Sequence, residues 1–166
     1  MDSAARILIA GQAPGVRVHA SGKPFTDPSG DRLRRWLGVD TGVFYDPRRI
    51  AILPMGFCFP GLSPKGSDLP PRSECAPLWR HRLMALLPRL ELVVALGRYA
   101  QDWHLGPRGG PSLDATVQNW RRALDCRPPV LPMPHPSWRN NAWLKRNPWF
   151  EAEVVPELRR RVAALL

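Results

Sequence analysis

The stretch Val130-Leu131-Pro132-Met133-Pro134-His135-Pro136-Ser137-Trp138-Arg139-Asn140 runs from an apolar segment directly into a loop that holds one histidine between prolines. Its first four residues have the length and composition of a buried strand. Proline fixes its own φ and restricts the residue before it, so the backbone around His135 is stiff. We therefore predict a titratable ring that is held in a fixed place at the end of a strand.

The same junction occurs at three other places in the chain. Apolar runs at residues 6–10, 49–53 and 91–96 each stop at a loop rich in Gly or Pro. Apolar spacing and capping residues predict helices at about 31–37, with Asp27 or Ser29 as its cap, and at 75–87, 98–103 and 112–124. Asn147-Pro148 predicts the start of a C-terminal helix that Pro156 kinks or restarts.

Strands that alternate with helices predict an α/β fold with a parallel sheet between two layers of helices. Unbroken apolar runs fit strands that are buried on both faces. The sequence contains no internal repeat and no linker, so residues 1–166 are expected to form one domain of the three-layer α/β/α class with four strands.

The charge of the chain indicates a polyanionic partner. Lys and Arg number 24 against 14 acidic residues, which gives a net charge of +10 and a pI near 10.9. Nearly all of the excess is Arg, whose forked guanidinium matches phosphate, so nucleic acid is the expected partner. A basic surface that only reflects an Arg-favouring genome is the alternative.

Membrane and disulfide-rich classes are not supported. No apolar run is long enough to span a bilayer, and no signal-peptide pattern follows Met1, so we expect a cytoplasmic protein. The three cysteines, Cys58, Cys75 and Cys126, are an odd and sparse set that does not suggest a disulfide framework. Cys126 is expected to be structural.

Ligands of open parallel sheets bind beyond the carboxyl ends of the strands. The loops at those ends are residues 11–25, 54–61, 97–99 and 134–140, and we expect them to converge on one rim. At this rim Phe25 can stack on a nucleobase. His135 can stabilise an anion or act as acid or base. Each feature also has a structural explanation. The Gly11–Gly15 turn can be an ordinary strand-to-helix turn, Phe25 a plug of the core, His135 a ring bonded to neighbouring backbone, and Trp138 a side chain packed beneath the loop.

Four segments together resemble the uracil-DNA glycosylase superfamily. Gly11-Gln12-Ala13-Pro14-Gly15 and His135-Pro136-Ser137-Trp138-Arg139-Asn140 are similar to its two signature motifs. Ser21-Gly22-Lys23-Pro24-Phe25 and Val94-Ala95-Leu96-Gly97-Arg98-Tyr99-Ala100 resemble segments of its iron–sulfur branch, family 4. The family fold is a four-stranded parallel sheet between helices, which agrees with the independent prediction above.

The resemblance implies a DNA repair enzyme that flips a deaminated base out of DNA and hydrolyses its N-glycosidic bond, without a metal and as a monomer associated with the bacterial nucleoid. It implies that His135 and N–H groups of the first loop stabilise the leaving base and that the 11–15 turn orients a water. The implied base-binding residues are Ala13, Pro14, Gly15, Phe25 and Met55. The implied DNA-binding residues are Gly97, Ser137, Trp138, Arg139 and Asn140.

Three places differ from the family pattern. Gln12 stands where the family 4 motif usually has Glu, and Ala13 stands where the best-known branch has Asp. Gln12 can orient a water but cannot act as a base, so Asp27 or His19 is considered as the base that activates water. Pro54-Met55-Gly56 replaces the Asn that selects uracil. Cys58 and Cys75 match only the later pair of iron–sulfur ligands, so they are a possible remnant, and a cluster requires two further cysteines upstream of this chain.

The leading hypothesis is therefore a glycosylase that removes a deaminated base, uracil first, from single- or double-stranded DNA. A non-catalytic or differently specific member that recognises damaged or single-stranded DNA is the second hypothesis. An Arg-rich α/β protein that binds RNA or a nucleotide is the third.

Overall fold

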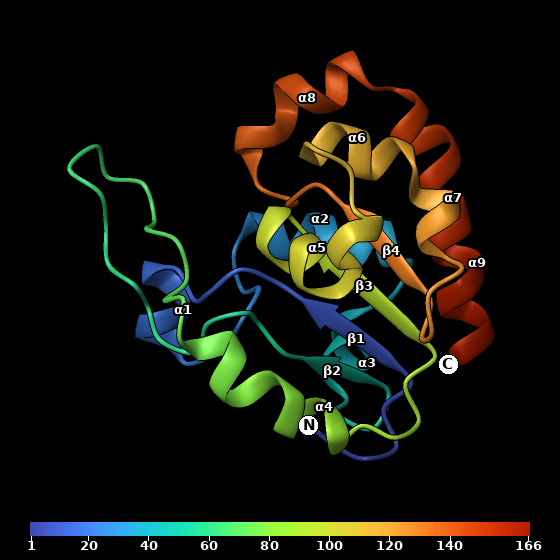
Figure 1. The fold of residues 1–166 in the computed structure, drawn as a ribbon, viewed down its shortest axis with the longest axis horizontal. Helices are drawn as coiled ribbons and strands as arrows, with labels where there is room; N and C mark the ends of the chain where they lie inside the picture. The colour runs from blue at the N-terminus through green and yellow to red at the C-terminus, as the bar shows by residue number, and fades with distance from the viewer.

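The computed structural model describes residues 1–166 and contains a four-stranded, all-parallel sheet in the order β2-β1-β3-β4 (Figure 1). The strands are β1 (Ile7–Ala10), β2 (Ile50–Ile52), β3 (Leu92–Leu96) and β4 (Val130–Met133). The predicted four-stranded parallel sheet is confirmed. The central strands β1 and β3 are buried along their whole length, because helices cover both faces, and this explains their unbroken apolar sequence.

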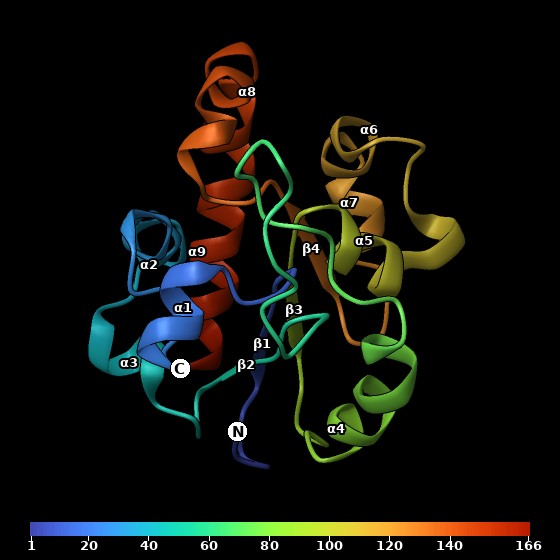
Figure 2. The same cartoon turned by 90° about the vertical axis from the view of Figure 1, so that its left-hand side faces the viewer.

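Alternate strand residues contribute to two separate hydrophobic cores. Ile7, Ile9 and Val94 belong to the core beneath α2 (Pro28–Leu37), α3 (Thr41–Tyr45) and α9 (Val155–Leu165). Leu8 and Val93 belong to the core beneath α4 (His81–Ala85) and α5 (Arg98–Leu105). The result is the predicted three-layer arrangement, which can be followed in two views (Figures 1 and 2).

Helix α2 forms as its sequence predicts. Of the two candidate caps, Asp27 takes the position, and its Oδ1 accepts a hydrogen bond from the Gly30 N–H at 3.3 Å. Pro28 occupies the first turn, where a missing N–H costs nothing, and the helix ends at Gly38. Because this helix is anchored at its first residue, it fixes the position of the loop that precedes it.

Short helices interrupt segments that carried no helical signal. The prediction that residues 11–25 form a loop is wrong in part, because α1 spans Val16–Ser21. Helices α3 and α8 (Asn141–Arg146) were not predicted either. The reason is the same in each case: α1 buries no residue, and α3 and α8 bury one each, so no periodic apolar face marks them in the sequence.

Other predicted helices are divided. The helix predicted at 75–87 is a π-helical turn, η1 (Ala76–Arg80), followed by α4, and that at 112–124 breaks at Asn119 into α6 (Leu113–Gln118) and α7 (Trp120–Ala123). Two 3-10 turns, η2 (Gly106–Arg108) and η3 (Trp138–Asn140), complete the connections.

The C-terminal helix begins differently from the prediction. Oδ1 of Asn147 accepts from the Trp149 indole instead of capping the helix, which opens as a π-helical segment, η4 (Phe150–Val154). It then restarts as α9 with Pro156 in its first turn, as predicted. None of the helices is long and apolar enough to cross a membrane.

Candidate active site

All four strands end at one edge of the sheet, and the loops that follow them are joined by backbone hydrogen bonds. The Met55 and Gly56 N–H groups donate to the carbonyls of Gly11 and Gln12, each at 2.9 Å. On the other side, the Gly97 N–H donates to Met133 O at 2.9 Å. The predicted convergence of the strand-end loops is therefore present, and we call this edge the rim.

Gly97 brings the third and fourth loops close together. Its φ of +79° lies in the region that favours glycine, and a Cβ at this position would lie 3.9 Å from Cβ of His135. The buried Gln101 side chain donates to the same Met133 carbonyl at 2.9 Å. Together these contacts fix the point at which the chain leaves β4 and enters the His135 loop.

His135 has a defined hydrogen-bonding state. The Ser137 N–H donates to its Nδ1 at 3.2 Å, so a neutral ring carries its proton on Nε2. Burial lowers the pKa of His135, an effect that Asp27 and Asp68 oppose and Arg139 reinforces. The Asn140 amide donates to the His135 carbonyl at 2.7 Å. The ring is thus held neutral and fixed, with Nε2–H free to donate to a ligand.

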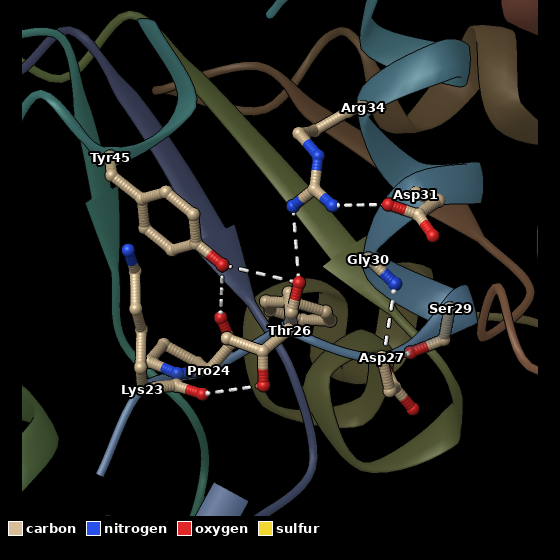
Figure 3. A network of polar contacts seen from close by, with 10 residues as sticks. Lys23, Pro24, Thr26, Asp27, Ser29, Gly30, Asp31, Arg34 and Tyr45 are labelled. Carbon is tan, nitrogen blue, oxygen red and sulfur yellow. Dashed lines mark hydrogen bonds and ion pairs between the residues drawn. The ribbon is translucent and has the colours of Figure 1, made fainter. Parts of the chain in front are cut away.

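Phe25 adopts a backbone conformation that is unusual for a bulky residue. Its φ is +59°, and no other non-glycine residue of the chain has a positive φ. The Tyr45 hydroxyl donates to the Pro24 and Phe25 carbonyls at 2.6 and 3.1 Å, and Arg34 donates to the Phe25 carbonyl at 3.1 Å. Figure 3 shows Tyr45 and Arg34 converging on this segment. Strain of this kind persists only where the surroundings enforce it, and it is concentrated at functional sites.

Gly30 completes this clamp by close approach. A Cβ at Gly30 would lie 1.8 Å from the Phe25 carbonyl oxygen, so no other residue fits there without moving Phe25. The Phe25 ring packs edge-on against Phe44, at 5.9 Å between centroids and 88°. Its Cζ lies 3.8 Å from where a Cβ of Gly11 would be. The half-buried ring therefore lies beside the first-loop turn, both against the core and at the rim.

The 137–140 segment lies at the outer side of the rim. Trp138 is 74% exposed, the highest value among the large hydrophobic side chains, and Arg139 lies beside its ring at 5.9 Å. The Ser137 carbonyl accepts from Arg32 at 3.3 Å, which ties this loop to α2. Trp138 does not pack beneath the loop, which leaves its ring available to a ligand.

The residues predicted to act on water and the residue Met55, predicted to contact the nucleobase, lie in different surroundings. Asp27 is engaged as the cap of α2, where its Oδ1 also accepts from the Ser29 hydroxyl at 2.6 Å. His19 is exposed on α1, with its ring 5.7 Å from that of Phe59. Gln12 donates through Nε2 to Leu69 O at 3.3 Å. Met55 is 4% exposed and packs in the second core, whereas Phe57 and Cys58 of the same loop are exposed.

Ala13, Pro14 and Gly15 form the half-buried surface of the first-loop turn. The catalytic and base-binding roles of these rim residues remain predictions, since proximity alone does not assign them.

Sequence reasoning missed a buried cation beneath the second loop. Arg80 is fully buried and donates to the carbonyls of Leu53 and Pro54 at 2.8 and 2.9 Å, and its Nη2 lies 2.6 Å from Nε2 of His104. Burial lowers the pKa of Arg80 to about 10, and burial and the Arg80 charge lower the pKa of His104 to about 3. Arg80 therefore fixes the loop that begins at Pro54. Its sequence signal, an Arg in a helix of mixed polarity, is too common to be informative.

The cysteines do not fit an iron–sulfur cluster. Cys58 is exposed, Cys75 is half-buried, and Cys126 is buried in the core beneath α4 and α5. No group of three or more His, Cys, Asp or Glu side chains is placed to hold a metal ion. Two thiols do not complete the ligand set of a four-iron cluster, so no step of the chemistry is assigned to one.

A basic surface hollow lies beside the rim rather than in it. It has a volume of about 620 Å³ and lies between α2, α8 and the C-terminal helix, and Arg32 links its wall to the Ser137 loop. Its charged lining residues are Arg32, Arg35, Lys145, Arg159 and Glu151. The excess of cations suits a phosphate backbone better than a buried base.

The chain matches the model of a known protein family. The family model described as the uracil DNA glycosylase superfamily matches residues 1–159 of the 166. The matched region contains all four strands and all four loops of the rim.

Proposed function

This chain belongs to the uracil DNA glycosylase superfamily, and from that premise we propose that it removes uracil from DNA by hydrolysing the N-glycosidic bond. Membership supports a glycosylase activity on DNA. Glycosylases of this superfamily mostly need no cofactor. We further propose that residues 1–166 act as one domain and as a monomer.

The observation that carries the proposal is the state of His135. In glycosidic hydrolysis the departing base takes the bonding electrons and becomes an anion. A neutral imidazole with Nδ1 occupied by Ser137 presents Nε2–H, which strengthens its hydrogen bond as charge develops on the base oxygen. A protonated ring would place an N–H at Nδ1, opposite the Ser137 N–H, so the lowered pKa of His135 suits this role.

Binding of the flipped base is assigned to Phe25. Its ring faces the Gly11 turn, and its backbone is clamped by Tyr45 and Arg34. Stacking on an aromatic ring stabilises a base by about 1–3 kcal/mol without regard to its identity. Selection of uracil is then assigned to the turn of Ala13-Pro14-Gly15 and to the loop that starts at Pro54, which is hydrogen-bonded to the first loop through Met55 and Gly56.

Contact with the DNA strand is assigned to two adjacent surfaces. Trp138 is exposed in the manner of a side chain that fills the gap left by a flipped nucleotide, with Arg139 beside it. The basic hollow between α2 and α8 continues from this loop and presents Arg32, Arg35 and Lys145 to flanking phosphates. The net charge of +10 favours the same partner.

A second candidate function is recognition of damaged or single-stranded DNA without catalysis. One observation favours it: Gln12, which occupies the place of the usual acidic residue, has no carboxylate to deprotonate water, and its amide nitrogen is hydrogen-bonded to the Leu69 carbonyl.

One experiment separates the two functions. The protein is incubated with single- and double-stranded oligonucleotides that contain uracil, with hypoxanthine oligonucleotides in parallel, and abasic sites are measured. We expect abasic product from uracil in the wild type, formed at a rate lower by about 100-fold or more in His135→Ala. Turnover of hypoxanthine alone would reassign the substrate, and binding without any product would establish the non-catalytic function.

A further inference from the structure

Residues 61–69 form an antiparallel hairpin that projects over the rim. Leu62 and Asp68 make a bridge, the Ser63 N–H donates to Ser67 O at 2.8 Å, and the Leu69 N–H donates to Gly61 O at 3.0 Å. The hydroxyls of Ser63 and Ser67 are 2.7 Å apart. In Figure 1 this is the green arm beside α1, on the side toward which the β1 arrow points.

The base of the hairpin is attached to the first two rim loops. Gln12 donates to the Leu69 carbonyl at 3.3 Å, one residue after Asp68. A Cβ added at Gly56 would lie 3.0 Å from the Cβ of Pro71, so these two residues pack closely together. Gln12, which stands in the place of the usual acid, thus holds the hairpin in position.

The hairpin carries a carboxylate to the first-loop turn. A Cβ on Gly15 would lie 3.5 and 3.7 Å from Oδ2 and Oδ1 of Asp68. Asp68 has no hydrogen-bond or ion-pair partner, whereas every other acidic side chain except Asp125 has one. Asp125 follows α7 and precedes β4, so it lies at the opposite edge of the sheet.

Asp68 also acts on the catalytic side of the rim. Its charge raises the pKa of His135, which opposes the effect of burial, and Asp27 acts in the same direction. An unpaired acid beside a DNA-binding rim repels phosphate, in a chain that otherwise carries an excess of cations. Its position therefore calls for a role other than DNA affinity.

We propose that Asp68 is the carboxylate that orients and deprotonates the attacking water, in place of the acid that the first-loop turn lacks at Gln12. The inference rests on the proposed glycosylase function. In the step it assigns, the C1′–N bond breaks and its electron pair leaves with the base, next to His135. The water oxygen bonds to C1′, and one water proton passes to the Asp68 carboxylate. Solvent later protonates the base anion.

The test compares carboxylate variants of the full chain on a uracil oligonucleotide under single-turnover conditions, with binding measured on a non-cleavable analogue. Asp68→Asn is expected to slow excision by about 100-fold or more, in the range of general-base catalysis, and to leave affinity unchanged or tighter. Asp125→Asn, the other unpaired acid, is the matched control and should keep wild-type activity. Asp27→Asn tests the competing carboxylate while retaining a residue that caps helices.

A chemical rescue distinguishes catalysis from structure. Formate added to Asp68→Ala is expected to restore part of the excision rate, because a free carboxylate can occupy the vacated space. An Asp68→Asn variant that excises uracil as fast as the wild type would overturn the inference. So would a loss of excision in Asp68→Ala that formate does not restore, or a loss of excision that occurs only in Asp27→Asn. A wild type that binds but excises no base from any lesion would instead refute the proposed function itself.

Discussion

The Ser137 N–H donates to Nδ1 of His135 at 3.2 Å, and this contact determines that the neutral ring carries its proton on Nε2. The two residues are separated only by Pro136, whose fixed φ restricts how the loop can relax. A ring that is placed and neutral before substrate arrives needs little reorganisation as the base departs.

The first prediction concerns this tautomer. Nitrogen NMR of the imidazole should show a proton on Nε2 and none on Nδ1 at pH 7, and titration should give a pKa below the ordinary 6.5 because burial disfavours the charged ring. Excision should fall when the pH drops through that lowered pKa, because protonation breaks the Ser137 contact. A proton on Nδ1 at neutral pH would contradict the assigned role.

A second prediction concerns the Phe25 clamp. Gly30→Ala places a Cβ 1.8 Å from the Phe25 carbonyl and must displace it, so we expect a loss of unfolding free energy of about 3 kcal/mol or more in urea titrations. Ser29→Ala, at the neighbouring position, removes one hydrogen bond to Asp27 and should cost about 1 kcal/mol. Equal effects of the two changes would show that the close approach is not required.

Trp138→Ala gives a third prediction. The side chain is 74% exposed and packs against little, so thermal stability should change by less than about 0.5 kcal/mol. Excision from duplex DNA should fall more than excision from single strands, since only the duplex has a stack to be filled. Trp79→Ala, a 48% exposed Trp on η1, is the control and should affect neither substrate.

Arg139→Ala tests the phosphate contact. Removing one contact should weaken DNA binding and reduce the slope of log K against log salt by about 0.7–0.9. Fluorescence anisotropy over a range of salt concentrations measures this directly. An unchanged slope with reduced affinity would mean that Arg139 contacts a base or supports Trp138 instead.

A fifth prediction follows from the buried pair of Arg80 and His104. Burial and the Arg80 charge lower the pKa of His104 to about 3, whereas the unfolded chain takes up this proton near 6.5. The unfolded state therefore binds more protons between these values, and stability falls as the pH falls through that window, by at most about 1.4 kcal/mol per pH unit.

His104→Gln should reduce that slope in urea titrations at pH 7, 6 and 5. His135 contributes a slope of the same sign, so the difference between variant and wild type isolates His104. No difference between the two slopes would contradict the buried, neutral state of His104.

The sheet was predictable because its strands are buried on both faces. Such strands have unbroken apolar sequences, as in Leu92–Leu96. The rim followed from topology, since parallel strands end at one edge. Its paired motifs could be read because prolines and glycines constrain backbone at His135 and Gly11. The short helix α1 could not be predicted, because it buries nothing and has no periodic face.

The supports of the site were invisible for another reason. Tyr45 and Arg34 act on Phe25 from α3 and α2, and nothing local to either residue indicates that contact. Asp68 lies in a polar loop of ordinary composition, and only the folded hairpin brings it to Gly15. Long-range contacts of this kind depend on the assembled fold, whereas strands and turns depend on neighbouring residues.

The most direct test of the glycosylase function is release of free uracil from a single-stranded oligonucleotide with one deoxyuridine, followed by mass spectrometry under single-turnover conditions. The proposed glycosylase function predicts stoichiometric uracil and an abasic strand from the wild type, and a rate lower by about 100-fold or more for His135→Ala with DNA affinity nearly unchanged. An intact strand after prolonged incubation with wild-type protein that binds the oligonucleotide would contradict it.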